Sequence, residues 1–254
     1  MPLTAPHTPL AVNAQWKGKS GLNLYADFVM ETDAVVGQIL DAIDRNLAAD
    51  QTLVIFTSDN GTAPYVGALD LAKQGHYCSG PLRGYKSDVW EGGHRVPLIV
   101  RWPGHVAPKT VCDKLVHQAD LMATCAAVTG AELPDSAGED SFSLLPLLKG
   151  SDAPVRQHAV SQASSGLSGV RQGAWKLIFG PGSGGWGKGA DEHPAQLYNL
   201  RRDVAETNNL FADRPDKVSE LTALMARLVN DGRSTPGTAQ KNAQPVNWQR
   251  FMQE

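Results

Sequence analysis

The stretch that decides the fold is residues 52–61, which read TLVIFTSDNG. Its first six residues are apolar or β-branched without polar alternation, so they predict a short strand buried on both faces, as in a parallel sheet. The strand ends abruptly at Ser58, where polar turn-forming residues begin. Ligands of α/β sheets bind beyond the carboxyl ends of the strands. The loop Ser58–Gly61 is therefore the first candidate for a site.

The segments around this strand indicate an α/β unit. Apolar residues recur at three- and four-residue steps over 24–47, which predicts an amphipathic helix before the strand. A second strand is expected at 97–102. A helix over 120–129 should end at Gly130, because glycine readily takes the left-handed conformation of a helix C-terminus. Residues 141–149 are expected to form a short helix or a turn.

The pattern changes after about residue 150. Short extended stretches around Gly173 predict a hairpin, and a one-sided apolar pattern after Pro215 predicts a helix that ends at Gly232. We therefore expect two units: 1–150, an α/β unit, and 151–254, a small antiparallel sheet with one helix. The elements expected in the second unit lie at 170–179, 196–200 and 215–232.

Composition excludes several classes of protein. The chain has 254 residues, of which 42% are hydrophobic and 19% charged, typical of a globular protein rather than a disordered one. Its 23 basic and 26 acidic residues show no basic excess, which argues against nucleic-acid binding. No apolar run is long enough to span a membrane, and the N-terminus lacks signal-peptide features, so no compartment is predicted. The three cysteines predict no disulfide framework, and Cys112 and Cys125 are expected to be buried.

Asp59 and Asn60 are candidate metal ligands. An acid and an amide side by side at a strand end can turn two oxygens toward one point, which suits Ca²⁺ or Mg²⁺. Asp-Asn-Gly is also favoured in turns for backbone reasons alone, so a simple strand-to-loop turn is the alternative.

Two cationic candidates flank this loop in the sequence. Lys86 lies in a loop, 81–97, that is rich in glycine and charge and precedes a strand, where a lysine can meet an anionic group of a substrate. The alternative is a solvated basic loop. His7 lies between Pro6 and Pro9, and histidine is the residue type most often used in acid–base work near neutral pH. A structural or exposed histidine is the alternative.

Together these stretches resemble the sulfatase family, specifically its arylsulfatase A-like branch in the alkaline phosphatase superfamily. The resemblance runs in order over nearly the whole chain. The matching stretches are 6–9, 24–27 with Glu31 and Asp33, 52–61, 82–86, 90–93, 101–104, and 197–200 with Asp203, Glu206, Asn209 and Leu210.

The resemblance implies a partial alkaline-phosphatase-like α/β fold, with a mixed sheet flanked by helices. By position, Asp59 and Asn60 match two ligands of the family's metal ion, usually calcium. Lys86 matches a lysine that contacts the sulfate, and His7 matches a histidine that also meets it. Sulfate ester cleavage builds negative charge on the leaving oxygen, which a cation and a lysine stabilise and a histidine can protonate.

The family's nucleophile is a formylglycine made from a Cys/Ser-x-Pro-x-Arg motif that lies upstream of the His-Thr-Pro region, as do two further metal-binding aspartates. We therefore expect this chain to correspond to the C-terminal part of a sulfatase. Ser79–Arg83 fits the motif literally, but Leu82 stands where a small residue is preferred. The chain alone is expected to bind cations weakly, to lack sulfatase activity and to be poorly soluble, because the strand 52–57 would be left as an exposed edge.

The function expected for the whole protein is hydrolysis of a sulfate ester, in a small molecule or a sulfated glycan. The alternatives are a phosphonate or phosphate ester hydrolase of the same superfamily, and an inactive remnant that serves as a binding module. The stretch Gly180–Gly189, with Trp186, is interpreted as a mobile surface loop rather than a pocket mouth. The aromatic residues Trp175, Trp248 and Phe251 are interpreted as packing residues.

Overall fold

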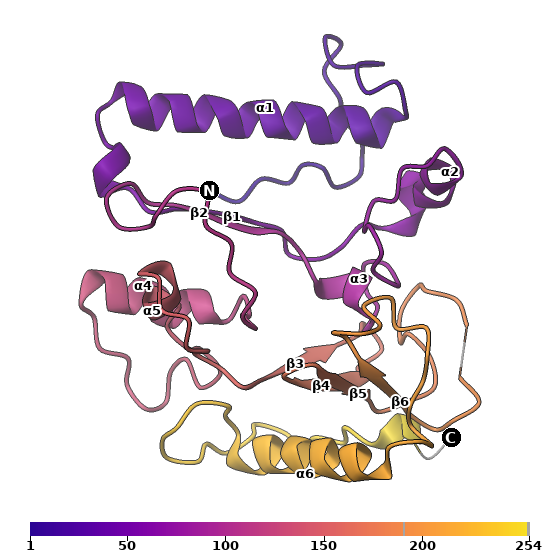
Figure 1. Ribbon diagram of the computed structural model, residues 1–254. Helices are drawn as coiled ribbons and strands as arrows, with labels where there is room; N and C mark the ends of the chain where they lie inside the picture. Colours follow the sequence, from indigo (N-terminus) through magenta and orange to yellow (C-terminus); the bar gives the residue numbers. More distant parts are fainter. Residues whose placement is uncertain (190, 253–254) are drawn as a thin grey trace.

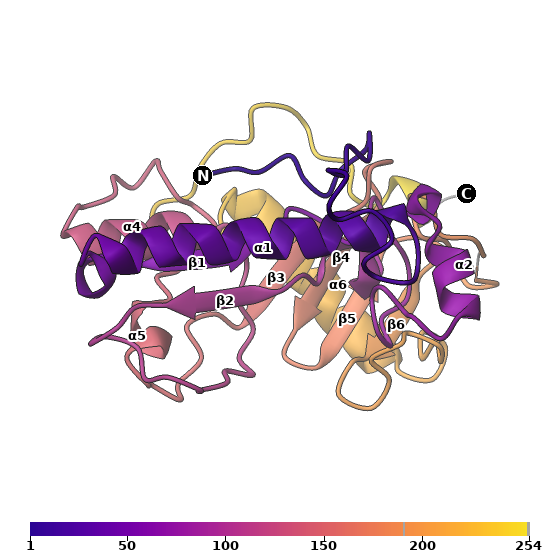
Figure 2. The ribbon, with the colours of Figure 1, turned by 90° about the horizontal axis from the view of Figure 1, so that it is seen from above.

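The computed structural model describes residues 1–189 and 191–252, arranged in layers (Figure 1). Helix α1 lies at one end, the strands β1 and β2 lie next to it, and the sheet β3–β6 is followed by α6 at the opposite end. Seen from above, α1 lies over β1 and runs along it, with β2 to one side (Figure 2). The elements are α1 (Leu24–Arg45), η1 (Ala49–Gln51), β1 (Val54–Thr57), η2 (Pro64–Val66), α2 (Ala68–Lys73), α3 (Glu91–His94), β2 (Leu98–Arg101), α4 (Asp120–Thr129), α5 (Leu145–Leu148), β3 (His158–Gln162), β4 (Ser168–Gln172), β5 (Trp175–Ile178), β6 (Gln196–Asn199), α6 (Pro215–Asp231) and η3 (Arg250–Met252).

Helix α1, which the sequence predicted, begins with a side-chain cap. The Asn23 side chain accepts the Ala26 N–H at 3.0 Å, which satisfies one of the free donors of the first turn. The buried Asp27 carboxylate accepts the N–H groups of Gly18 and Ser20, at 2.7 and 2.8 Å. These bonds hold the preceding loop against the first turn of the helix.

Strand β1 corrects the expectation of a strand buried on both faces in a parallel sheet. It pairs antiparallel with β2, with Phe56 opposite Ile99. In the described part of the chain, β2 is the only strand that pairs with β1. Phe56 is 39% exposed and Ile99 60%. An apolar run without alternation does not specify pairing direction. The direction was decided by the connection, in which loops and short helices return the chain to β1.

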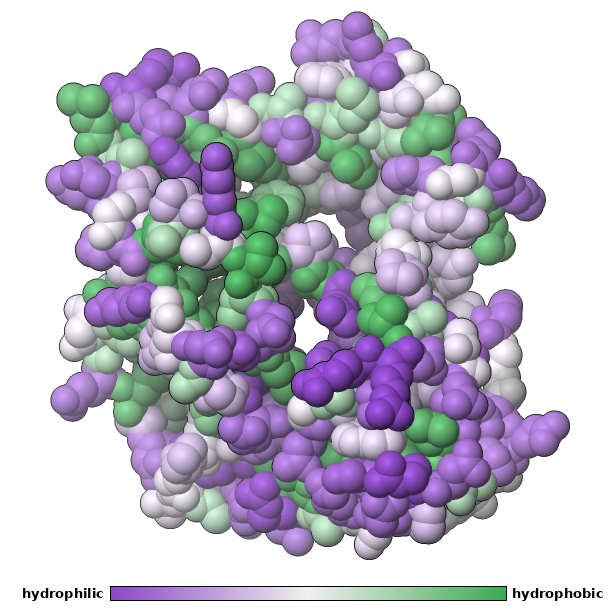
Figure 3. Space-filling model, viewed as in Figure 1, coloured by the Kyte–Doolittle hydropathy of each residue, from purple (hydrophilic) through white to green (hydrophobic). Residues whose placement is uncertain are grey.

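Hydrophobic residues gather at the surface over the α1 and β1–β2 part of the molecule (Figure 3). They include exposed side chains of α1, Val29 and Met30, as well as the two strand residues just named. Within the described residues, this layer leaves part of its apolar surface open to solvent.

The second sheet has the order β3-β4-β5-β6, with every neighbouring pair antiparallel. The predicted hairpin is confirmed, with Gly173 in the left-handed conformation at its turn. Helix α6 packs Leu221 and Met225 against Leu177 and Leu197 of the sheet, in the largest apolar cluster. Strand β3 was not predicted, because its sequence has no clear alternation. The boundary near residue 150 stays a prediction.

Most of the smaller expectations are confirmed. The helices and strands at 97–102, 120–129, 196–200 and 215–232 are present, and 141–149 contains the short α5. Trp248 packs edge-on against Phe179 at 4.6 Å, while Trp175 and Phe251 pack against the two apolar clusters. The expectation for Cys112 and Cys125 is wrong: both are exposed, one on a loop and one on the outer side of α4. None of the described helices combines the length and apolarity that crossing a bilayer requires.

Candidate active site

Two predicted site loops meet at the short helix α3. The Gly61 N–H donates to the Gly93 carbonyl at 2.9 Å, and the Lys86 N–H donates to the Thr62 carbonyl at 2.9 Å. The first bond ties the loop of Asp59 and Asn60 to α3. The second ties the same loop to the backbone of Lys86. Strand end and lysine loop are thus joined by direct backbone hydrogen bonds.

Glycine is required where these segments touch. A Cβ atom on Gly61 would lie 1.8 Å from the Gly92 carbonyl oxygen, and one on Gly93 would lie 2.2 Å from the Asp88 carbonyl oxygen. Both neighbours are backbone atoms that cannot swing away. The glycines therefore permit the close approach of three backbone segments that any side chain would separate.

The side chains at the strand end offer oxygen donors. Asn60 donates its Nδ2 to the Gly61 carbonyl at 2.9 Å, which leaves its amide oxygen available, and the exposed Asp59 carboxylate makes no hydrogen bond or ion pair within the described residues. This donor set fits a hard cation but supplies only two of its about six to eight oxygen ligands. Across the described part of the chain, no group of three or more His, Cys, Asp or Glu residues is arranged to hold a metal.

The loop after Lys86 is held by the second sheet's connecting segments. Ser87 has a positive φ of 77°, unusual for a residue with a side chain, and its carbonyl accepts the Ser164 N–H at 3.0 Å. The buried Asp88 carboxylate accepts the N–H groups of Tyr85 at 2.7 Å and of Gly187 at 2.9 Å. The backbone of Lys86 is therefore fixed from both sides.

The Gly180–Gly189 segment is partly exposed, as a surface loop would be, but it is hydrogen-bonded to the segment that follows Lys86. In addition to the Gly187 bond to Asp88, the Ser183 carbonyl accepts the Val89 N–H at 2.9 Å. Trp186 lies edge-on against Tyr65, with ring centroids 5.3 Å apart. Glycine content predicted flexibility, but the missing side chains here serve close packing against the Asp88 turn.

His7 stands apart from the other candidates. His7 is exposed, and its ring Nδ1 lies 2.7 Å from the Thr8 carbonyl oxygen, within hydrogen-bond distance. Its backbone N–H donates to the Thr4 carbonyl at 3.0 Å. Within the described residues no hydrogen bond or ion pair joins it to Asp59 or Lys86. The structure thus brings together the loops of Asp59, Asn60 and Lys86, whereas the role of His7 stays a prediction.

Arg83, the last residue of the Ser-x-Pro-x-Arg stretch, has a packing role. Its guanidinium lies 3.6 Å from the centre of the Trp90 ring and donates to the Glu206 carbonyl at 2.8 Å. It also reaches the Tyr198 hydroxyl at 3.3 Å. These contacts join the lysine loop to the second sheet, in line with the view that this stretch is not a nucleophile site.

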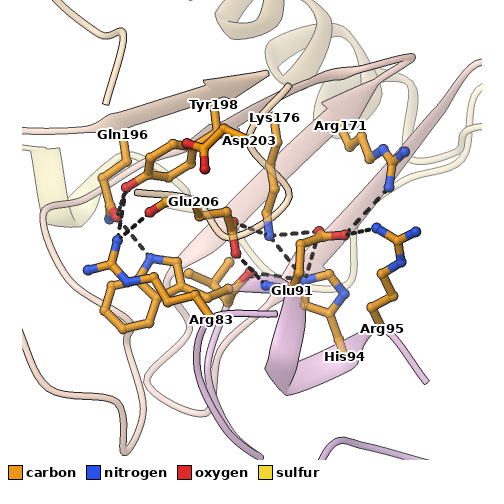
Figure 4. Close-up of polar contacts among 12 residues, drawn as sticks. Arg83, Glu91, His94, Arg95, Arg171, Lys176, Gln196, Tyr198, Asp203 and Glu206 are labelled. Atoms are coloured by element: carbon orange, nitrogen blue, oxygen red, sulfur yellow. Dashed lines mark hydrogen bonds and ion pairs between the residues drawn. The ribbon is translucent and has the colours of Figure 1, made fainter. Parts of the chain in front are cut away.

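Sequence reasoning missed a cluster of buried charges behind α3 (Figure 4). Lys176 Nζ lies 3.0 Å from Glu91 Oε1 and 2.9 Å from Glu206 Oε1, with all three side chains almost fully buried. Burial alone would raise the pKa of Glu91, but the surrounding positive charges, that of Lys176 first among them, and the hydrogen bond from Lys176 together outweigh burial, and the pKa is lowered to about 2. Burial raises the pKa of Glu206. Both acids lie in stretches that matched a family, yet nothing in the sequence marked their partner.

The neighbouring His94 is kept neutral. Burial, together with the nearby charge of Lys176, lowers its pKa to about 4. Its Nε2 bonds the Val89 carbonyl at 3.0 Å. The ring therefore serves as a neutral hydrogen-bonding group at the end of α3 rather than as a cation.

Comparison with known proteins identifies the family. The family model described as Sulfatase matches residues 1–131, and the model described as N-sulphoglucosamine sulphohydrolase, C-terminal, matches residues 85–234. The chain belongs to the sulfatase family. The resemblance noted in the sequence is thereby confirmed, and so is the α/β fold class.

Individual sulfatases match over most of this chain. The N-acetylgalactosamine-6-O-sulfatase of Bacteroides thetaiotaomicron is 36% identical and the match covers 86% of this chain and 44% of that protein. Arylsulfatase A of Homo sapiens is 34% identical, with 87% of this chain and 46% of that protein covered. A solved structure from a Bacteroides thetaiotaomicron locus for glycosaminoglycan metabolism superimposes with a TM-score of 0.80 at 33% identity, over 89% of this chain and 48% of that one. The chain thus spans about half the length of these relatives.

Proposed function

We propose that this chain forms part of the active site of a sulfate ester hydrolase. In it, Asp59 and Asn60 hold a divalent cation, usually Ca²⁺ in this family, and Lys86 and His7 contact the sulfate. The observation that carries the proposal is the pair of bonds from Gly61 to Gly93 and from Lys86 to Thr62, each 2.9 Å. They hold the loop that carries Asp59 and Asn60 against the backbone of Lys86 and α3.

The chemistry required is charge stabilisation at a sulfate ester. Hydrolysis adds water across the sulfate ester bond and leaves an alcohol and sulfate, with negative charge developing on the leaving oxygen. The ammonium group of Lys86 opposes that charge, and His7 supplies a proton to the leaving oxygen. The cation, when bound, acts as a Lewis acid on the sulfate oxygens. The nucleophile expected for the family, a formylglycine, belongs to the whole protein.

The substrate class favoured is a sulfated sugar. The support for this class is the relative from Bacteroides thetaiotaomicron, which is named an N-acetylgalactosamine-6-O-sulfatase. Small aryl sulfates serve as practical probes, since a relative from Homo sapiens is named an arylsulfatase. Phosphonate or phosphate monoesters are the competing substrates within the superfamily.

The test begins with the coding sequence on the 5′ side of residue 1, in the same reading frame. A frame with Cys/Ser-x-Pro-x-Arg and early aspartates is expressed whole and assayed on an aryl sulfate and an aryl phosphonate. Lys86→Ala should lower sulfate turnover by about 10²- to 10³-fold, the usual effect of removing one electrostatic stabiliser of a transition state. Lys73→Ala is the control, because Lys73 is exposed and, among the described residues, forms an ion pair with Asp70 of α2 alone.

Each outcome has a clear meaning. Faster turnover of the phosphonate would replace the sulfatase assignment with the phosphonate hydrolase. A stop codon and a start signal at residue 1 would favour the inactive binding module. Equal turnover by the Lys86 and Lys73 variants would remove Lys86 from the site.

A further inference from the structure

Lys176 is a buried lysine that lies behind the candidate active site. It comes from the second sheet, far along the chain from the loops that carry Asp59 and Lys86. It projects from β5 of the second sheet and is 1% exposed. Its Nζ donates a hydrogen bond to Glu91, the first residue of α3, at 3.0 Å. Its contact with Glu206 Oε1 at 2.9 Å is an ion pair without hydrogen-bond alignment. One lysine thus connects the second sheet to the helix on which both site loops rest.

Glu206 completes this connection through the backbone. Its other oxygen, Oε2, accepts the Glu91 N–H at 2.7 Å. Glu206 is fully buried and has a positive φ of 52°. A residue with a side chain holds this conformation only where its surroundings enforce it, and such positions cluster at functional sites. Glu91, at the start of α3, is therefore held at two points. Lys176 binds its side chain, and Glu206 binds its backbone N–H.

The path from Glu91 to the site loops is one or two residues long. The Gly92 N–H donates to the Arg83 carbonyl at 2.7 Å, on the segment leading to Lys86. The Gly93 carbonyl accepts the Gly61 N–H at 2.9 Å, directly after Asn60. A shift of α3 must therefore move both loops.

The charge balance makes Lys176 central to this grip. Two further cations, Arg95 and Arg171, approach only the outer oxygen of Glu91, at 3.5 and 3.6 Å. Within the described residues, Lys176 alone bridges Glu91 and Glu206. Without it, two carboxylates would face each other in a buried space, and their repulsion would push α3 away from the second sheet.

We propose that Lys176 is a positioning residue: by binding Glu91 and Glu206 it fixes α3, and so sets the spacing between the Asp59–Asn60 loop and the loop of Lys86. Its meaning for catalysis rests on the proposed function. The geometric claim does not, since it concerns two backbone bonds that can be measured without substrate.

The experiment is amide hydrogen exchange by NMR on this chain, comparing Lys176→Met with Arg156→Met. Arg156 is a matched control: it is also a buried cation, pairs with Asp120 at 2.6 Å, and makes no hydrogen bond or ion pair with α3 among the described residues. Thermal unfolding of both variants gives the loss of global stability. The readouts are the amides of Gly61 and Lys86.

After correction for global stability, Lys176→Met should speed exchange of these two amides at least about tenfold, and Arg156→Met should not, because local opening is separable from global unfolding. Equal effects of the two variants, or unchanged protection in Lys176→Met, would overturn the proposal. If Lys176→Met does not fold, Glu206→Gln is used, which keeps the size and a side-chain oxygen but removes the charge. It should speed the same two amides to a smaller extent, and unchanged protection would again overturn the proposal. Absence of sulfatase activity in the whole protein would leave this result untouched and would count against the proposed function alone.

Discussion

Lys176 Nζ and Glu91 Oε1 lie 3.0 Å apart although their residues are separated by 85 positions in the chain. This contact joins an antiparallel sheet to the helix that carries the glycines between the two site loops (Figure 4). The second sheet is therefore in direct contact with the α/β unit through a buried ion pair. Its buried lysine contacts the helix that lies behind the candidate active site.

Gly61→Ala should destabilise the chain and loosen the site. The new Cβ would overlap the Gly92 carbonyl oxygen, so α3 and the strand-end loop must separate. We expect a loss of about 1–3 kcal/mol of unfolding free energy, as for other overpacked positions, measured by urea denaturation. Gly37→Ala is the control: it lies within α1 with open space around it and should stabilise slightly, through helix propensity. Equal stability of the two variants would contradict the close approach at Gly61.

Asp120→Ala should be among the most destabilising single changes. Its buried carboxylate pairs with Arg156 at 2.6 Å and accepts the N–H groups of His117 and Phe142, at 2.8 and 3.0 Å. Removing one partner of a buried pair costs about 3–5 kcal/mol, because the other charge is left uncompensated. Chemical denaturation measures the loss. Asp216→Ala removes an exposed partner of Arg214 and should change stability little; a comparable loss there would contradict this account.

Cation binding by the chain should be weak and should depend on Asp59. Two oxygen donors at the strand end give few ligands, so we expect a dissociation constant of about 1 mM or weaker for Ca²⁺. Calcium titration followed by NMR should show shifts at Asp59 and Asn60 that Asp59→Ala abolishes. Asp70→Ala, at an exposed carboxylate on α2, should leave them unchanged. Shifts that survive in Asp59→Ala would place the cation elsewhere.

His94 should make the chain less stable in mild acid. Its pKa is lowered to about 4 in the folded chain, against a usual value of 6.5. Between these values the unfolded chain binds more protons, so the unfolding free energy falls as the pH falls from 6.5 toward 4. The side chain is 34% exposed, and solvent screening reduces the effect. Urea denaturation at pH 7 and pH 5 should show a smaller loss for His94→Gln than for the unaltered chain. An identical loss in both would exclude His94 as the source.

The exposed pair Phe56 and Ile99 should limit solubility. The two residues lie opposite each other on β1 and β2, and exposed apolar strands promote edge pairing between molecules. Ile99→Lys should raise the concentration at which light scattering begins to increase. Val111→Lys is the control, since Val111 is exposed but lies outside the strands. An equal gain from both variants would attribute the effect to net charge alone.

Local pattern was sufficient for much of the fold. Three- and four-residue apolar spacing located α1 and α6, and glycines at 130 and 232 located the ends of α4 and α6. The strand 52–57 was located correctly, but its partner and direction were not. Periodicity describes one segment at a time, whereas pairing depends on the path between segments.

By itself the sequence determined the longer helices α1, α4 and α6, the strand at 52–57 and the family, since these follow from local spacing and from motifs in order. It also singled out Asp59, Asn60, Lys86 and His7 as candidates, because oxygen ligands suit a metal ion and cationic side chains suit an anionic group. The tertiary structure decided which of their loops come together. A contact between Lys176 and Glu91 depends on where a sheet and a helix pack, and no local pattern encodes that distance. Tertiary packing also decides that the Gly180–Gly189 segment is hydrogen-bonded to Asp88. It likewise decides that β1 pairs with β2 in the antiparallel direction.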